Sequence, residues 1–348
     1  MALLQTIRSV SRCVNRNRTR VSTREHPKDL VGDVMPYYTT EMGAAYLGDS
    51  RTLLEKVKKK SVHLVMTSPP FALTRQKSYG AEFDKVDPDS YVEWFLEFAS
   101  RIYDTLVPDG SFVVHLGGTW LPGLPLKSLY QNKLVVKLCE EIPFHLAQDL
   151  YWANTAKLPT PAQWVAVKRI RVKDAVDSIW WFCKNERGIT RANNRRVLQP
   201  YSDSMEELLR RGSYNAGRRP SGHDISKDSF LKRNPGSIPP NLLNISGSES
   251  NSAYLRYCRQ YDIEVNPARY PVALPEFFVK LLTRKGDVVL DPFAGSNATG
   301  EAAQKQNRRW LAFELHKPYL KGSQFRFFNP EELGFEPPQK HPAQVQRT

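Results

Sequence analysis

The stretch VHLVMTSPPF, residues 62–71, places a short apolar run directly before two prolines. A brief run of valine, leucine and methionine is typical of a buried parallel strand. Pro69 and Pro70 cannot continue a central ladder, so the strand must end there and a loop must follow. The stretch therefore predicts a buried strand over 62–66 with Ser68 in the loop at its end.

A helix and a second strand are predicted after this stretch. Asp87 and Pro88 supply an N-cap and a first-turn proline, and apolar residues recur at helical spacing over 88–106. Residues 108–110 read Pro-Asp-Gly and predict a turn, and 111–116 read as the next strand. Strand, helix and strand in this order predict a right-handed parallel unit.

A second unit of the same kind lies near the C-terminus. Residues 287–290 predict a strand, 291–300 a loop of small residues and 297–306 a helix. A further strand over 310–313 ends on Glu314. Two such units predict an α/β fold with a mostly parallel sheet and helices on both faces.

The composition limits the class of protein. The 348 residues contain 50 Lys and Arg against 36 Asp and Glu, which gives a net charge of +14. This excess favours a nucleic-acid partner, although a merely basic enzyme is the alternative. An apolar content of 41% is enough for a core and excludes wholesale disorder. No window approaches the roughly 18 uninterrupted apolar residues of a membrane helix, so we expect no membrane partner.

The cysteine and histidine spacing argues against two kinds of site. The four cysteines contain no C-x-x-C pair, and the seven histidines show no H-x-x-x-H spacing. We therefore expect no disulfide framework, no metal and a reducing compartment.

The ends and the middle of the chain differ from the rest in composition. The first 24 residues hold six arginines and no acid, which is typical of a basic arm on DNA or of an organelle presequence. We favour the first interpretation and expect a flexible arm over 1–36 and a tail over 331–348. Over 185–262 arginine, serine, glycine and proline are frequent, and only 205–209 and 254–261 look helical. This region is predicted to be an inserted module.

The loop 291–300 has the features of a nucleotide cradle. Small residues allow close backbone approach, and the helix start beyond them offers free N–H groups. Glu314 ends the next strand at the place of an acid that binds ribose hydroxyls. The loop reads G-S-N-A-T-G, with Asn297 where glycine is common. An ordinary turn and a dinucleotide site are the alternatives.

The TSPPF box suits chemistry on the amino group of a base. That nitrogen is a poor nucleophile because its lone pair is delocalised into the ring, so a catalyst must offer acceptors to its hydrogens. Ser68 Oγ and the Pro69 carbonyl are two such acceptors, since an extended Pro-Pro backbone leaves its carbonyls unused. Phe71 offers a face for stacking. The alternative is a simple proline-rich turn.

An ordered set of motifs now marks a family resemblance. The set is YLGDS (46–50), TSPPF (67–71), DGSFVV (109–114), NPARYPVALPEFF (266–278) and DPFAGSN (291–297). Over 37–330 the chain resembles S-adenosylmethionine-dependent DNA methyltransferases that modify amino groups. It is most similar to the cytosine-N4 group of type II restriction–modification systems, of the Pvu type.

The resemblance implies a fold and a division of the chain. The fold would be a permuted Rossmann-like methyltransferase, with a catalytic half over 37–184 and a cofactor half over 263–330. Residues 185–262 would be the target-recognition region. Within this region the arginine-rich and lysine-rich stretches lead us to expect DNA contacts by Arg218, Arg219, Lys232 and Arg233.

The resemblance also implies site residues. The implied catalytic residues are Ser68, Pro69, Pro70, Phe71 and His115. The implied cofactor-binding residues are Asp49, Thr67, Pro267, Arg269, Asp291, Phe293, Gly295, Ser296, Asn297 and Glu314. Serine in the first box position points to cytosine, because adenine enzymes mostly carry Asp or Asn there. His115 departs from the family, whose members carry an acid at that strand end; it could accept a proton or merely pack.

The sequence therefore predicts a bacterial, cytoplasmic enzyme that methylates cytosine N4 in duplex DNA after the base has left the stack. A cognate restriction endonuclease would act on the same site without direct contact. The alternatives are adenine-N6 methylation and a basic DNA-binding protein without activity.

Overall fold

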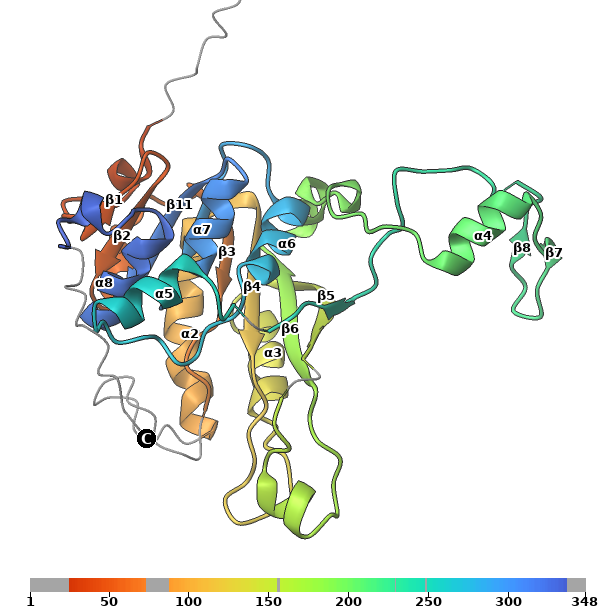
Figure 1. Cartoon of the computed structure of the whole chain (residues 1–348), viewed down its shortest axis with the longest axis horizontal. Coiled ribbons are helices and arrows are strands. Elements are labelled where there is room, and N and C mark those ends of the chain that lie inside the picture. The colour runs from red at the N-terminus through yellow and green to blue at the C-terminus, as the bar shows by residue number, and fades with distance from the viewer. Residues whose placement is uncertain (1–24, 73–87, 155–156, 229, 248, 337–348) are drawn as a thin grey trace, which may run out of the picture.

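The computed structural model describes residues 25–72, 88–154, 157–228, 230–247 and 249–336. Within these ranges nine strands form one sheet in the order β1-β2-β11-β10-β3-β4-β6-β5-β9 (Figure 1). These strands are β1 (Tyr38–Thr39), β2 (Gly43–Leu47), β3 (Val62–Thr67), β4 (Leu106–Leu116), β5 (His145–Ala153), β6 (Val176–Cys183), β9 (Leu242–Asn244), β10 (Val288–Asp291) and β11 (Arg309–Glu314). The helices are α1 (Ser50–Lys56), α2 (Pro88–Thr105), α3 (Tyr130–Glu140), α4 (Asp203–Arg211), α5 (Ala253–Gln260), α6 (Ala273–Leu282), α7 (Ala298–Lys305) and α8 (Lys317–Ser323).

The centre of the sheet is parallel, as predicted. Strands β2, β11, β10, β3 and β4 pair in parallel, whereas β1, β6 and β5 run antiparallel to a neighbour. The strands expected over 62–66, 287–290 and 310–313 correspond to β3, β10 and β11. The predicted α/β class is therefore confirmed.

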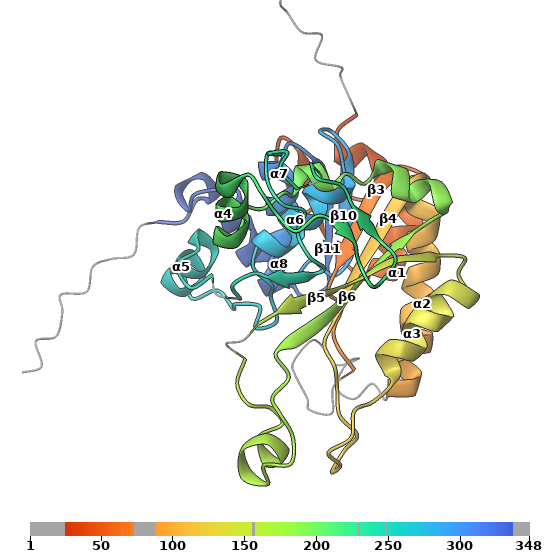
Figure 2. The same cartoon turned by 90° about the vertical axis from the view of Figure 1, so that its right-hand side faces the viewer.

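Helices cover both faces of this sheet, and the strand alternation explains how. Val65 packs into a core with α1, α2 and α3, while its neighbour Leu64 packs into a core with α6, α7 and α8. Successive side chains of a strand point to opposite faces of the sheet. A strand with apolar side chains on both faces therefore needs helices on both faces. Figure 2 shows α2 and α3 on one side of β3 and β4, and α6 and α8 on the other.

The turn predicted over 108–110 is wrong. Strand β4 runs through these residues, and the Gly110 carbonyl accepts a hydrogen bond from the Lys184 N–H at 3.2 Å. The register with β3 shifts here, since Val62 pairs with Leu106 and Leu64 with Ser111. The Pro-Asp-Gly sequence thus forms an irregularity within one strand instead of reversing the chain. The predicted helix over 88–106 is confirmed as α2, and its proposed N-cap Asp87 lies outside the described residues.

The predicted ends of the fold are also partly wrong. Residues 27–30 form a short 3-10 helix, and Leu30 and Val31 are buried, so 25–36 are not a flexible arm. At the other end, Phe335 packs against Tyr261 and Phe325, so 331–336 belong to the fold. Apolar burial explains both corrections. Residues 1–24 and 337–348 lie outside the described ranges.

The predicted insertion is smaller than 185–262. Helix α5 packs on α8, and β9 pairs with β5, so both belong to the main body. Gln199 and Ser237 exchange two backbone hydrogen bonds, and the chain between them projects with α4 and the hairpin β7 (Gly217–Arg218) and β8 (Asp224–Ile225) (Figure 1). We call residues 200–236 the projecting module. The helices expected over 205–209 and 254–261 are confirmed as α4 and α5.

A second projection, which the sequence did not predict, lies between β5 and β6. In Figure 1 it extends downward, whereas the projecting module extends to the right. Among the described residues no helix is long and apolar enough to cross a membrane.

Candidate active site

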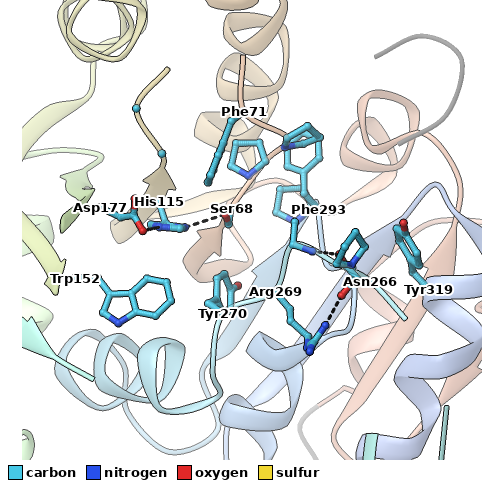
Figure 3. A pocket seen from close by; sticks show the side chains of 18 of the residues that line it. Ser68, Phe71, His115, Trp152, Asp177, Asn266, Arg269, Tyr270, Phe293 and Tyr319 are labelled. Atoms are coloured by element: carbon cyan, nitrogen blue, oxygen red, sulfur yellow. Dashed lines mark hydrogen bonds and ion pairs between the residues drawn. The ribbon is translucent and has the colours of Figure 1, made fainter. Parts of the chain in front are cut away.

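The carboxyl ends of the parallel strands place the predicted site residues on one edge of the sheet. Strands β3, β4, β10 and β11 all end there, and ligands of open α/β sheets bind at such an edge. A cavity of about 460 Å³ lies at this edge (Figure 3). Eleven of the predicted catalytic and cofactor residues line it: Asp49, Ser68, Pro69, Pro70, Phe71, His115, Pro267, Arg269, Phe293, Gly295 and Glu314.

Thr67 and Asp291 lie beneath the cavity wall. The Thr67 hydroxyl donates to one Asp291 oxygen at 2.7 Å, and the Phe293 N–H donates to the same oxygen at 3.1 Å. The other oxygen accepts from the hydroxyls of Tyr270 at 3.0 Å and Thr299 at 2.6 Å. Asp291 is only 1% exposed, and burial raises its pKa. Their polar atoms join β3 to β10 beneath the cavity, so direct cofactor contact by these two residues stays a prediction.

Ser296 and Asn297 also shape the loop from below. Asn297 has φ of 55° and caps α7, since its side-chain oxygen accepts from the Gly300 N–H at 3.0 Å. Asparagine tolerates this left-handed conformation, which explains why it replaces glycine here. Ser296 accepts a hydrogen bond from Arg326 at 3.0 Å. Both residues are buried and lie outside the lining of this cavity, although Ser296 lines a smaller pocket that shares Ser68 and Arg269 with it, so their cofactor contacts stay predictions.

Glu314 is held by two backbone groups. The N–H groups of Gly295 and His316 donate to its two carboxylate oxygens at 2.7 and 2.8 Å. Burial raises the pKa of Glu314. A carboxylate oxygen can accept more than one hydrogen bond, so each oxygen keeps capacity for a ligand hydroxyl.

Asp49 and Arg269 line other parts of the same cavity. Asp49 caps α1 and pairs with the Arg51 guanidinium at 2.6 Å, and this hydrogen bonding lowers the pKa of Asp49. Arg269 donates one N–H to the Asn266 carbonyl at 2.7 Å, and a guanidinium has five. Carboxylates for hydroxyl and amino groups, together with a guanidinium for a carboxylate, fit the polar groups of S-adenosylmethionine.

At the other end of the cavity a chain of polar groups starts from Ser68. Its hydroxyl lies 2.9 Å from His115 Nδ1, and His115 Nε2 lies 3.8 Å from an Asp177 carboxylate oxygen (Figure 3). His115 is 5% exposed, and its Nε2 has no hydrogen-bond partner among the described atoms. Asp177 also pairs with Lys157. Burial would raise the pKa of Asp177, but His115 and Lys157 hold it below its ordinary value.

Aromatic rings surround this chain. The ring centroids of Phe71 and Trp152 each lie 5.6 Å from that of His115, and the Tyr270 ring lies 6.3 Å away. A Cβ on Gly117 would come within 2.5 Å of the Phe71 ring, so glycine is needed for this ring to lie over the end of β4. The arrangement provides a polar hydroxyl inside an aromatic chamber, which suits a planar base.

The sequence reasoning missed Asp177, Trp152 and Tyr270. Asp177 is a lone acid at the start of the apolar strand β6, and an acid in such a strand is a signal of a partnered buried charge. The four cations predicted to bind DNA are not in the cavity. Arg218, Arg219, Lys232 and Arg233 all lie in the projecting module, where Arg233 pairs with Glu206 at 2.9 Å. Among the described residues no group of His, Cys, Asp and Glu side chains could hold a metal ion.

Comparisons with known proteins agree with this geometry. A family model described as DNA methylase matches residues 62–325. The type II methyltransferase M.PvuII of Proteus hauseri is 48% identical over 296 residues, covering 84% of this chain and 86% of that protein. The type II methyltransferase M.BamHI of Bacillus amyloliquefaciens is 23% identical over 306 residues, covering 86% of this chain and 60% of that protein.

Solved structures agree as well. The PvuII DNA methyltransferase, described as cytosine-N4-specific, matches with a TM-score of 0.69 and 41% identity over 86% of this chain and 90% of that one. A Thermus thermophilus protein solved in complex with S-adenosyl-L-methionine matches with a TM-score of 0.50 and 21% identity over 81% of this chain and 92% of that one. The second likeness shows the fold alone.

Proposed function

Because the chain belongs to the N6/N4 DNA methylase family, we propose that it transfers a methyl group from S-adenosylmethionine to N4 of cytosine in double-stranded DNA. The observation that carries this proposal is the single cavity that holds Ser68 and Phe71 at one end and Glu314 at the other. Donor and target can thus meet in one chamber. The PvuII enzyme, to which this chain is similar, is described as cytosine-N4-specific, which agrees with serine in the first box position.

At the cofactor end, residues of the cavity bind and orient the donor. Glu314 accepts hydrogen bonds from the ribose hydroxyls, and Asp49 accepts one from the adenine amino group. Arg269 offers its remaining N–H groups to the methionine carboxylate. S-adenosylmethionine, when bound, supplies a methyl group on a positively charged sulfur.

At the target end, Ser68 prepares the amino group. In the His115 tautomer that carries its proton on Nε2, the Ser68 hydroxyl, 2.9 Å away, donates to Nδ1, which leaves the oxygen lone pairs free to accept an amino hydrogen of the base. The Pro69 carbonyl accepts the second hydrogen, and the nitrogen becomes pyramidal with its lone pair aimed at the methyl group. Phe71 supports the base by stacking.

His115 and Asp177 form the path for the proton that the base nitrogen loses. As the bond between the nitrogen and the methyl carbon forms, the bond between that carbon and the donor sulfur would break. The positive charge would then pass from the sulfur to the nitrogen, which must lose one hydrogen as a proton. Ser68 takes this proton and passes its own to His115, and the Asp177 carboxylate stabilises the resulting imidazolium. Asp177 acts through His115 and is a positioning residue, as in serine-histidine-aspartate sites.

Nucleoside analysis of DNA tests this function. Purified protein is incubated with duplex DNA and labelled S-adenosylmethionine, and the digested nucleosides are identified by mass spectrometry. We expect N4-methylcytosine. N6-methyladenine would assign the protein to the other branch of the family, and no methylated nucleoside would leave a DNA-binding protein.

We also infer that the enzyme protects bacterial DNA from a type II endonuclease in the cytoplasm. The relatives M.PvuII and M.BamHI are named type II methyltransferases, which supports this role. Sequencing of modified bases maps the site, and DNA modified there should resist an endonuclease of that specificity. Unchanged cleavage would contradict the protective role.

A further inference from the structure

The projection between β5 and β6 carries a surface that the proposed chemistry does not use. It spans residues 157–173, which we call the basic lobe, and a short π-helix over Gln163–Val167 forms its end. Figures 1 and 2 show it extending away from the helices and the sheet. In both views the loop between β4 and α3 extends beside it.

The basic lobe combines positive charge with exposed apolar side chains. Its cations are Lys157, Lys168, Arg169, Arg171 and Lys173, and no Asp or Glu lies between 157 and 173. Four apolar residues on it are largely exposed: Leu158 at 76%, Val167 at 74%, Ile170 at 60% and Val172 at 86%. Apolar side chains gathered on one small surface mark an interaction site.

The exposed apolar side chains of the basic lobe lie on a segment that is held by specific contacts. The Arg171 guanidinium stacks on the Trp120 ring at 3.6 Å and donates to the Pro125 carbonyl at 2.7 Å. The Ile170 N–H donates to the Trp164 carbonyl at 3.0 Å. These contacts fix the segment from both sides, so Ile170 and Val172 are presented by an ordered backbone.

The root of the basic lobe is part of the catalytic chamber. Lys157, Leu158 and Thr160 line the same cavity as Ser68. Lys157 also pairs with Asp177, the residue behind His115. A cytosine that enters this chamber from a duplex must therefore pass beside the lobe.

Duplex DNA fits this surface better than a second copy of the chain. Self-association through the lobe would bring two sets of five cations together on a protein of charge +14. A polyanion neutralises the same charges. Extrusion of a base also leaves a gap in the stack, and apolar side chains inserted between bases fill such gaps in other DNA complexes.

We propose that the basic lobe binds the duplex beside the target cytosine, with Lys168 and Arg169 on phosphates and with Ile170 and Val172 in the space that the extruded base leaves. This inference rests on the proposed methyltransferase function. It assigns to the lobe the step that holds the base outside the helix, separately from the chemistry at Ser68.

The test compares two double variants on two DNA substrates. I170S/V172S removes the apolar side chains, and K168A/R169A removes the phosphate contacts. Matched controls are V136S, a half-exposed valine on α3, and K56A, an exposed lysine at the end of α1 remote from the cavity. One duplex carries the mapped site with the target cytosine paired, and the other has an abasic position opposite that cytosine.

Each variant has its own expected pattern in single-turnover methylation. I170S/V172S should be slowed about tenfold or more on the paired duplex and return to within about threefold of wild type on the abasic one, since extrusion there costs little. K168A/R169A should bind both duplexes more weakly, and the slope of log affinity against log salt should fall by about two units. The two controls should match wild type on both.

Three results would overturn the lobe's role. These are a wild-type rate of I170S/V172S on the paired duplex, an equal loss on both duplexes, and a dimer in sedimentation that the same variant dissociates. Unfolding temperature and cofactor affinity are measured for every variant, because an equal loss with a lower unfolding temperature means that the lobe only supports the fold. If the wild-type protein makes no N4-methylcytosine on either duplex, the proposed function itself has failed.

Discussion

At the scale of single residues, the proposed chemistry depends on Ser68. The hydrogen bond proposed between Ser68 and the amino group would strengthen as the nitrogen becomes pyramidal, and such an interaction lowers the barrier rather than the ground state. Ser68→Ala should therefore slow single-turnover methyl transfer by roughly a hundredfold, about 2.7 kcal/mol, with cofactor and DNA affinities within a few-fold of wild type. Transfer of labelled methyl at saturating DNA measures the rate.

Ser61 offers the matched control for this change. It precedes β3 at its other end, and its hydroxyl bonds only to the nearby Lys58 carbonyl at 2.6 Å. Ser61→Ala should leave the rate unchanged. A Ser68→Ala enzyme that works at the wild-type rate would reduce Ser68 to a residue of a proline turn.

Asp177 is the second residue-scale test. Asp177→Asn should lower the turnover rate about tenfold or more while cofactor affinity stays constant, because the imidazolium loses its carboxylate. The family resemblance implies an acid at the position of His115, so adding His115→Asp to this variant should recover part of the rate. Asp149→Asn, an exposed change on β5, is the control.

Single-turnover rates and unfolding curves of the four proteins are compared. A double variant no faster than Asp177→Asn, with all proteins folded, would remove Asp177 from the proton path. An unchanged rate in Asp177→Asn would do the same.

The sequence could predict Ser68, Phe71 and Glu314 because each belongs to a local motif. Asp177 escaped prediction for a physical reason. It meets His115 only because β4 and β6 pair antiparallel, and the segments between these strands give no local signal of that pairing. Contacts of this kind depend on sheet order, which a short motif does not contain.

At the scale of elements, the bond between Thr67 and Asp291 joins the ends of β3 and β10. Thr67→Val leaves a buried carboxylate with one donor fewer and should lower the free energy of unfolding by about 1–3 kcal/mol. Thr52→Val, an exposed change on α1, is the control. Urea unfolding at neutral pH measures the difference, and equal stability of the two variants would contradict a joining role.

The loss of stability in Thr67→Val should depend on pH in a direction that follows from the pKa of Asp291. Burial raises the pKa of Asp291 above its unfolded value, so the stability contributed by this group is lost as pH rises through the folded pKa. The Thr67 hydroxyl opposes this rise in pKa, because its hydrogen bond stabilises the ionised Asp291 carboxylate. The deficit of Thr67→Val should therefore be largest at neutral pH and shrink as pH falls through the raised pKa. A deficit that grows on acidification would reverse the assignment.

Glu314, the last residue of β11, is the acid proposed to bind the cofactor ribose. Because burial raises its pKa, the group becomes protonated at a less acidic pH than an ordinary glutamate. Affinity for S-adenosylmethionine should fall as pH decreases through that pKa, since a protonated acid accepts ribose hydroxyls less well. Glu314→Gln should bind weakly at every pH, while Glu140→Gln on α3 should follow wild type. Calorimetry over this pH range checks the trend, and a pH-independent wild-type affinity would contradict it.

The elements themselves were largely predictable, with an instructive failure. Helix α2 follows directly from its apolar period, and β3 and β10 follow from their short apolar runs. The Pro-Asp-Gly sequence at 108–110 favoured a turn on local grounds. Pairing of β4 with both β3 and β6 overrides this preference, because a strand held on two sides absorbs turn residues as an irregularity.

At the scale of the whole molecule, the parallel sheet and the shared cavity could be predicted, but the division of the insertion could not. Residues around β9 and α5 resemble loops in composition, yet they pair and pack with the main body. The composition of a segment indicates whether it is suited to contact with solvent. It does not reveal which strand, far away in the chain, the segment pairs with. The result confines the projecting module to 200–236, and this makes a sharper test of target recognition.

The projecting module can be removed without stretching the chain, because Gln199 and Ser237 already exchange two backbone hydrogen bonds. We expect a protein with 200–236 replaced by a short glycine linker to fold and to bind S-adenosylmethionine as wild type does. It should lose site-specific methylation, since Arg218, Arg219, Lys232 and Arg233 leave with the module.

In the full chain, single alanine variants of these four residues test the same role. Alanine at a residue that binds a phosphate should reduce the slope of log affinity against log salt by about one unit, and alanine at a residue that reads a base should relax the site preference. Binding at several salt concentrations measures the slope, and methylation mapping on whole plasmids measures the site preference. A shortened protein that still methylates only the wild-type site would place recognition in the main body or the basic lobe.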